Sequence, residues 1–323
     1  MRSRRSNIPS RPRAPASAQG PRGIEELDRF SAASLERWAD VSGDLDELHD
    51  SLYFGMEPGR RRYRSELIDA LKVCDPVQVP LSNWCRIVTY RYSLAPLSCA
   101  GSLQYIGGRF NAGTELDGGT LAAWPALYLA EDFETAFREK FQRASDTSEN
   151  GLSPQEMALE PGASMSCVIV HGSLTNVFDL TSLTSLAPIA KVFGKISMPS
   201  KAVKLKKKLK IAEGGVRPVK TAKQAYDAVL KFNWRIAPVQ FGLPSPSQIL
   251  GELVRAAGFE AILFQSSKGP GKCLAVFPDN LFDGSFINLT DTPPDGVTHR
   301  RLDATSAGEL AGWDSVPHQL RAR

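Results

Sequence analysis

Residues 247–277 carry the most regular pattern in the chain, a helix followed directly by two strands. The apolar side chains of the helix recur at helical spacing, at Ile249, Leu250, Leu253, Val254 and Ala257. Gly258 then predicts the end of the helix, because glycine readily takes the left-handed conformation found there. The apolar segments 260–265 and 272–277, on either side of a loop rich in glycine, predict two strands.

The other patterned segments place helices before the strands and then mix the two. Apolar residues at helical spacing predict helices between residues 24 and 71. Alternating β-branched and aromatic residues predict strands at 85–92, 125–130 and 164–174. A helix with Asp132 at its N-cap is predicted after the second of these strands. This order lacks βαβ regularity and contains no internal repeat, so it predicts an α+β fold.

The chain of 323 residues is long enough for one large domain with a well-buried core, and its 42% hydrophobic content is ordinary for a globular protein. Residues 1–22 contain almost nothing to bury and predict a disordered basic tail. We expect a helical N-terminal extension at 23–80, a main domain at 81–285 and a C-terminal tail at 286–323. The main domain includes a weakly patterned, lysine-rich insertion at about 181–246.

Several classes of protein do not fit the sequence. No apolar run approaches the roughly 20 residues that cross a membrane. The basic N-terminus is not followed by the apolar segment of a secretory signal. The five cysteines are scattered and never form a C-x-x-C pair, which favours free thiols and a cytoplasmic location. The four histidines lie far apart in sequence, so they predict no metal site.

Two further motifs were considered as sites for phosphate or nucleic acid. Residues 266–273, SSKGPGKC, lack the early glycine and the final Ser or Thr of a phosphate-binding P-loop, so we exclude that motif. Residues 201–210 contain six lysines and could bind nucleic acid. No aromatic residues are interleaved with these lysines, which favours a solvated segment instead.

Four pieces remain as a candidate site: Arg86 on a strand, the segment 105–111 (YIGGRFN), Glu139 on a helix and Ser266 at the end of a strand. Each has a structural explanation by itself. Arg86 could lie on the surface of its strand, Glu139 could pair with Arg143, and Ser266 could form a turn. Their order and local context favour a shared site.

These segments resemble the RES domain, found in bacterial toxins of the RES–Xre type and named for an arginine, a glutamate and a serine. The arginine strand of the family is matched by CRIV with Arg86, and its GGRwN segment by 107–111. The remaining matches are Tyr128, Ala130, Glu131, Ala136 and Glu139, followed by Gly258, Phe259, Ile262, Ser266, Gly271, Val276 and Phe277. The resemblance covers about 190 residues and leaves out the first 80 and the last 40.

The sequence departs from the family pattern at a few positions. Phe110 stands where the family usually has tryptophan, Ala261 where it has glycine, and Lys268 where it has arginine. The lysine-rich region between the third and fourth pieces is also long compared with compact members. Arg91 lies close enough in sequence to be an alternative to Arg86.

The resemblance implies an ADP-ribosyltransferase-like fold, a mixed sheet with flanking helices, that takes NAD⁺ as its substrate and cleaves the nicotinamide–ribose bond. Phosphate or water would accept the ADP-ribose, and no cofactor or metal would be required. Glu139 is the candidate to stabilise the oxocarbenium-like state. Arg86, with Arg109 as a second cation, would bind the diphosphate, because arginine offers a fork-shaped donor. Ser266 completes the catalytic set as a donor.

The remaining substrate-binding candidates surround the ribose and nicotinamide. Tyr128 would stack on the nicotinamide or the edge of the ribose. Gly107 and Gly108 would let the backbone approach the ligand, Asn111 would donate to it, and Phe110 would pack inward. The family also implies a neutralising partner, an antitoxin of the Xre type. Transfer of ADP-ribose to a protein, a binding module without activity and a nucleic-acid-binding protein remain the alternatives.

Overall fold

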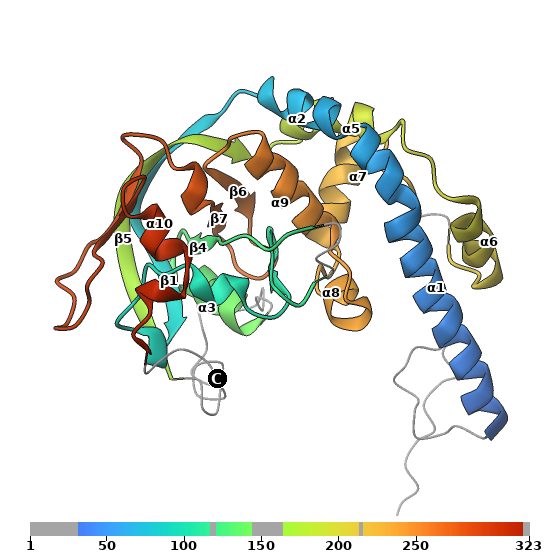
Figure 1. Ribbon diagram of the computed structural model, residues 1–323, viewed down its shortest axis with the longest axis horizontal. Helices are drawn as coiled ribbons and strands as arrows, with labels where there is room; N and C mark the ends of the chain where they lie inside the picture. The colour runs from blue at the N-terminus through green and yellow to red at the C-terminus, as the bar shows by residue number, and fades with distance from the viewer. Residues whose placement is uncertain (1–31, 117–120, 144–163, 213–215, 319–323) are drawn as a thin grey trace, which may run out of the picture.

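The computed structural model describes residues 32–116, 121–143, 164–212 and 216–318 (Figure 1). These residues form a mixed α+β fold, as predicted, with one large sheet and helices packed against it. The predicted disordered tail at 1–22 lies outside the described residues.

The large sheet closes into a ring, because its first strand in the spatial order pairs with two other strands. Its seven strands run in the order β1 (Val77–Thr89), β4 (Leu127–Ala130), β7 (Lys272–Val276), β6 (Ala261–Gln265), β5 (Met165–Asp179), β8 (Phe286–Leu289) and β9 (Arg301–Asp303). β1 also pairs with β5 in a long antiparallel ladder, so the first five strands in this order form a ring. β5 and β6 are parallel, and the other pairs are antiparallel.

The strands β6 and β7 are buried on both faces, which explains why their sequences are mostly apolar without alternation. On β6, Ile262 and Phe264 belong to one cluster of buried residues, whereas Ala261 and Leu263 belong to another. Successive side chains of a strand point to opposite faces, and the alternation assigns one cluster to each face.

The helices on the first face come from distant parts of the chain. The cluster there includes side chains of α2 (Arg64–Lys72), α5 (Ala187–Phe193), α7 (Ala222–Tyr226) and α9 (Pro246–Ala256). α9 begins with a capping box, in which Ser245 and Gln248 satisfy each other's backbone N–H groups. On the second face, residues of α10 (Ala307–Ala311) join the buried cluster.

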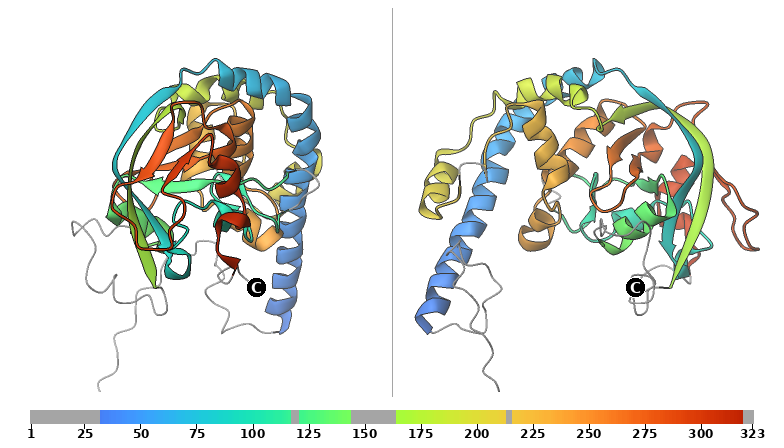
Figure 2. Two further views of the ribbon diagram at one scale, coloured as in Figure 1. Left: turned by 60° about the vertical axis from the view of Figure 1, so that its left-hand side comes forward. Right: turned by 180° about the vertical axis from the view of Figure 1, so that it is seen from behind.

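The long helix α1 (Ala32–Arg62) runs beside the body of the molecule on the side away from β5 (Figures 1 and 2). The lysine run forms α6 (Ser200–Lys208), which packs on α1 through Leu48, Ala202 and Leu205. Lys208 of α6 forms an ion pair with Asp44 of α1 at 2.8 Å, and Lys201 pairs with Glu47. Part of the basic charge of this run is therefore balanced by acidic residues of the same chain.

Several residues have roles that their local sequence did not predict. The strand β1 begins at Val77, inside the expected N-terminal extension, and the expected tail at 286–323 supplies β8, β9 and α10. The expected insertion supplies Leu186 and Ile189 to the main core. Among these elements, α5, β8, β9 and α10 are short, so too few apolar residues recur in each to give a clear period.

Candidate active site

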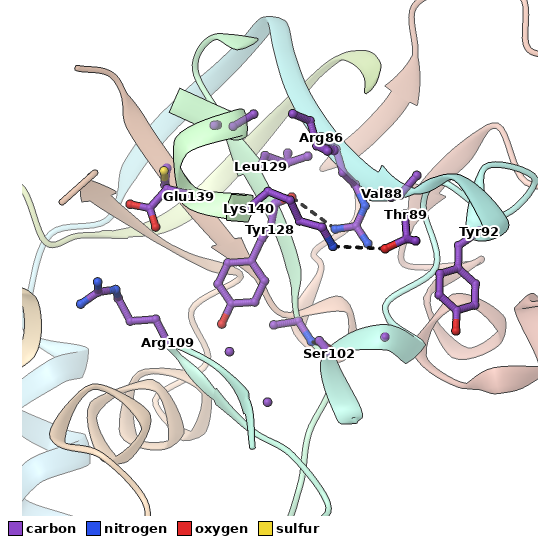
Figure 3. A pocket seen from close by; sticks show the side chains of 18 of the residues that line it. Arg86, Val88, Thr89, Tyr92, Ser102, Arg109, Tyr128, Leu129, Glu139 and Lys140 are labelled. Carbon is purple, nitrogen blue, oxygen red and sulfur yellow. Dashed lines mark hydrogen bonds between the residues drawn. The ribbon is translucent and has the colours of Figure 1, made fainter. Parts of the chain in front are cut away.

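A cavity of about 400 Å³ opens between β1, β4, the helix α3 (Phe133–Phe141) and the segment 105–111 (Figure 3). Its charged lining residues in the described part of the chain are four cations and one carboxylate: Arg86, Arg109, Lys140, Arg235 and Glu139. The cavity therefore carries an excess of positive charge around a single acid. That charge distribution is suited to an anionic ligand.

The segment 105–111 forms a small hairpin on one wall of the cavity, from β2 (Gly107–Gly108) and β3 (Asn111–Ala112). Gly107 has a φ of +78°, which favours glycine. A Cβ atom at Gly108 would lie 2.4 Å from the hydroxyl oxygen of Tyr128. Both glycines line the cavity, but their absent side chains are explained by the turn and by Tyr128 rather than by a ligand.

Asn111 is fully buried and does not line the cavity. Its Nδ2 donates to the carbonyls of Ser102 and Trp124, and its Oδ1 accepts from the backbone N–H of Gly108 at 3.0 Å. The amide thus fixes the hairpin, and the prediction that Asn111 donates directly to a ligand does not agree with this placement. Phe110 packs inward, as expected, with its ring 4.8 Å from that of Phe264.

Tyr128 projects from β4 into the middle of the cavity (Figure 3). Its hydroxyl accepts from the backbone N–H of Phe110 and donates to Oδ1 of Asn111, both at 2.9 Å. Burial raises the pKa of Tyr128 above its usual value, so the hydroxyl stays protonated at neutral pH. The ring is held rigidly and presents an apolar surface to a ligand.

Glu139 and Ser266 meet although they are 127 residues apart. The Ser266 hydroxyl donates to Oε1 of Glu139 at 2.6 Å, and the backbone N–H of Ser267 donates to the same oxygen at 3.2 Å. Ser266 also accepts from the backbone N–H groups of Lys268 and Gly269. Glu139 lines the cavity and Ser266 does not, so the serine lies behind the carboxylate and orients it.

The loop 266–271 is fastened to the start of α3, which carries Glu139. Asp132 caps this helix, as predicted, by accepting from the backbone N–H of Thr135 at 2.7 Å. The Thr135 hydroxyl accepts from the backbone N–H of Gly271 at 2.9 Å, and Cβ atoms at Gly269 and Gly271 would collide with Thr135 and Asp132. The glycines that superficially resemble a P-loop serve this contact.

Arg86 lies on β1 with its guanidinium beside the cavity (Figure 3). Nε donates to the carbonyl of Pro96 at 2.7 Å, Nη2 to that of Ser98 at 2.8 Å and Nη1 to that of Tyr128 at 3.2 Å. Burial lowers the pKa of Arg86 from its usual value, although a guanidinium remains charged in proteins. Arg86 therefore fixes three backbone carbonyls and has donors left for a ligand, since the fork has five N–H groups.

Lys140 is a cation of the cavity that the sequence reasoning missed. Its Nζ lies beside Arg86 and 3.4 Å from the Thr89 hydroxyl (Figure 3). Burial and the charge of Arg86 both lower the pKa of Lys140 from its usual value. Two adjacent cations with no carboxylate between them form a place where an anion would be stabilised. The sequence feature that could have indicated this role is the position of Lys140 directly after Glu139.

Arg109 lies near Glu139 on the opposite side of Tyr128 from Arg86 (Figure 3). Its Nη1 donates to the carbonyl of Val229 at 3.1 Å and its Nη2 to the Ser267 hydroxyl at 3.0 Å. Burial lowers the pKa of Arg109, and the charge of Glu139 opposes that shift. Arg109 thus supplies a fixed positive charge next to the carboxylate.

Gln248 supports the hairpin through its side-chain amide, a role that the sequence did not lead us to expect. It is fully buried, and its Nε2 donates to the carbonyls of Ile106, Gly108 and Asn111 at 2.8–3.1 Å. Its Oε1 accepts from the backbone N–H of Ser245, which makes the cap of α9 part of the support of the site. The S-x-x-Q spacing before an apolar helix was the available signal.

The cavity brings together most of the candidate residues and adds aromatic ones. Arg86, Gly107, Gly108, Arg109, Tyr128 and Glu139 line it, whereas Ser266 and Asn111 contact lining residues from behind. The aromatic lining residues that were not predicted are Tyr92, Trp234, Phe264 and Trp313. Within the described residues, no group of three or more His, Cys, Asp or Glu side chains could hold a metal ion. No helix among them has the length and apolar character needed to span a membrane.

No protein-family model matches the chain, and no curated protein is significantly similar to it. A solved structure that is similar is the crystal structure of the M. tuberculosis MbcT–MbcA toxin–antitoxin complex. The likeness has a TM-score of 0.38 at 15% sequence identity and covers 76% of this chain and 96% of that chain. A likeness of this strength does not establish a shared fold or activity.

Proposed function

We propose that this protein is a RES-type toxin enzyme with an ADP-ribosyltransferase-like fold that destroys NAD⁺. The observation that carries the proposal is Glu139, the one carboxylate among the described residues that line the cavity, placed among four cations. NAD⁺ has a diphosphate that needs cations. Its nicotinamide–ribose bond breaks through a positively charged state that a carboxylate stabilises.

The roles of the residues follow from their contacts. Glu139 faces the ribose and either stabilises the developing charge at C1 or holds a ribose hydroxyl. Ser266 and the N–H of Ser267 fix Oε1 of the carboxylate, and we assign its other oxygen, Oε2, to the substrate. Arg86 and Lys140 bind the diphosphate, and Tyr128 lies along the sugar between these two ends.

The bond between C1 of the ribose and the nicotinamide nitrogen breaks, and its electron pair stays on the nitrogen, so nicotinamide leaves as a neutral molecule. An oxygen of phosphate or water then bonds to C1, and the acceptor releases one proton to the solvent. The product is ADP-ribose 1″-phosphate with phosphate as the acceptor and ADP-ribose with water. No cofactor takes part in this sequence.

Mass spectrometry of NAD⁺ incubated with the protein, with and without phosphate, tests the proposal and identifies the acceptor. We expect loss of NAD⁺ with release of nicotinamide, and a large loss of this activity in Glu139→Gln. Glu115→Gln is the matched control, because Glu115 is exposed and does not line the cavity. Full activity of Glu139→Gln would refute the assigned role, and a mass increase of the protein itself would indicate transfer to protein instead.

We further propose a neutralising partner of the Xre antitoxin type, because an enzyme that destroys NAD⁺ harms the cell that makes it in its cytoplasm. Expression of the protein alone should then stop growth, and expression of Glu139→Gln should not. Equal growth arrest by both would contradict the proposal.

A further inference from the structure

The C-terminal residues 307–316 contribute to the wall of the cavity. Trp313 and Val316 line the cavity. The segment is firmly attached: the backbone N–H of Cys99 donates to the carbonyl of Leu310 at 2.8 Å, and the hydroxyls of Ser98 and Ser315 lie 2.6 Å apart. The cavity wall thus includes a segment whose sequence indicated only a tail.

Trp313 forms an aromatic pair with Tyr92, which also lines the cavity. The ring centroids are 6.3 Å apart, with an angle of 57° between the ring planes. The guanidinium of Arg91 lies over the Tyr92 ring at 5.0 Å, which helps to hold that ring in place. Ala95 and Gly101, the neighbouring lining residues, have little or no side chain. This end of the cavity is therefore aromatic and lightly filled.

The order of groups along the cavity matches the order of groups in a dinucleotide. In Figure 3, Glu139 lies at one side, Arg86 and Lys140 lie between, and Tyr92 lies at the opposite side. In NAD⁺ the diphosphate likewise lies between the nicotinamide riboside and the adenosine. With the nicotinamide ribose at Glu139 and the diphosphate at the two cations, the adenine reaches the aromatic pair.

We propose that Tyr92 and Trp313 form a binding site for the adenine base, an inference that rests on the proposed function. Every base has a flat π-face that stacks on aromatic side chains, and Ala substitution of such a side chain weakens binding by about 5- to 150-fold. The pair makes no contact with the reacting bond, so it contributes to substrate binding and not to bond cleavage. Its loss should raise KM for NAD⁺ and leave kcat unchanged.

Calorimetric titration with ADP and with inorganic pyrophosphate tests the site without any reaction. Trp313→Ala should weaken ADP binding by about 5- to 150-fold and change pyrophosphate binding by less than about twofold. Tyr92→Ala should behave in the same way. Tyr90→Ala is the matched control, because Tyr90 is an exposed aromatic residue of the same turn that does not line the cavity.

Three results would overturn the inference. They are unchanged ADP binding by Trp313→Ala, equal loss of ADP and pyrophosphate binding by a folded variant, and wild-type protein that binds ADP no better than pyrophosphate. If Trp313→Ala does not fold, Trp313→Leu keeps an apolar side chain in the segment and gives the same comparison.

NAD⁺ kinetics separate the two proposals. Cleavage of NAD⁺ with the same KM in Trp313→Ala and wild type overturns the adenine site and leaves the proposed function standing. ADP binding that depends on Trp313, in a protein that leaves NAD⁺ intact, supports the base site and overturns the NAD⁺-cleaving function.

Discussion

Arg86→Ala should destabilise the fold as well as the site, because the guanidinium joins β1 to the segment 96–98 and to β4. The substitution leaves the carbonyls of Pro96, Ser98 and Tyr128 without their charged donor. A hydrogen bond to a charged group contributes about 1.5–3 kcal/mol. Water from the cavity can replace some of these bonds, so we expect a loss of about 3–5 kcal/mol rather than the full sum.

Urea unfolding of Arg86→Ala and Lys140→Ala measures this difference. Lys140 contacts the same part of the cavity through one hydrogen bond of 3.4 Å, and its removal should change the free energy of unfolding by less than about 0.5 kcal/mol. Arg86→Lys should also be destabilised, because a single ammonium cannot match the fork geometry. A free energy of unfolding for Arg86→Ala within about 1 kcal/mol of the wild type would refute the reasoning.

The free energies of unfolding of these two variants decide how a loss of enzymatic activity in each of them is interpreted. Inactivity of Arg86→Ala by itself would not assign Arg86 to the substrate, since the wall of the cavity would also change. Lys140→Ala keeps that wall, so a raised KM for NAD⁺ in this variant is the cleaner evidence that the two cations bind the diphosphate.

Ser266→Ala should lower kcat by about tenfold or more with KM nearly unchanged, since it removes the 2.6 Å donor to the catalytic carboxylate; an unchanged kcat would contradict this role. Gly108→Ala should lower activity because its Cβ would lie 2.4 Å from the Tyr128 hydroxyl, whereas Gly43→Ala should not, since its Cβ meets nothing within 4 Å and Gly43 does not line the cavity. Iodoacetamide should label Cys167 before the four buried cysteines, because a hydrogen bond from a neighbouring thiol lowers the pKa of this exposed cysteine. Peptide mapping that finds a buried cysteine labelled first would show that this expectation is wrong.

The local sequence pattern was enough to predict the elements in which apolar residues recur over many positions, or whose ends are marked by a capping residue or a glycine. The helix α9, the strands β6 and β7, and the helix α3 with its Asp132 cap agree with the prediction. The short strands β8 and β9 have too few residues to show an alternating pattern. The pairing of β1 with β5 joins residues 76 to 100 positions apart, and no local sequence pattern indicates such a distant pairing.

The residue types of the site could be predicted better than their contacts. The meeting of Glu139 with Ser266 agrees with their selection as candidates, but which of them faces the cavity depends on packing. Asn111 was expected to donate to a ligand, and its amide instead contacts Gly108 and Tyr128 behind the cavity wall. Gly108 lines the cavity, where Tyr128 fills the space that a side chain at Gly108 would need. Trp313 gave no signal because an aromatic residue in a polar segment is ordinary.

The most direct test of the central claim is the amount of nicotinamide that the purified protein releases from excess NAD⁺. We predict many molecules of nicotinamide per molecule of wild-type protein, and far fewer with Glu139→Gln. Release of no nicotinamide would contradict NAD⁺ cleavage. Release that stops at one molecule per protein would contradict turnover with phosphate or water as the acceptor.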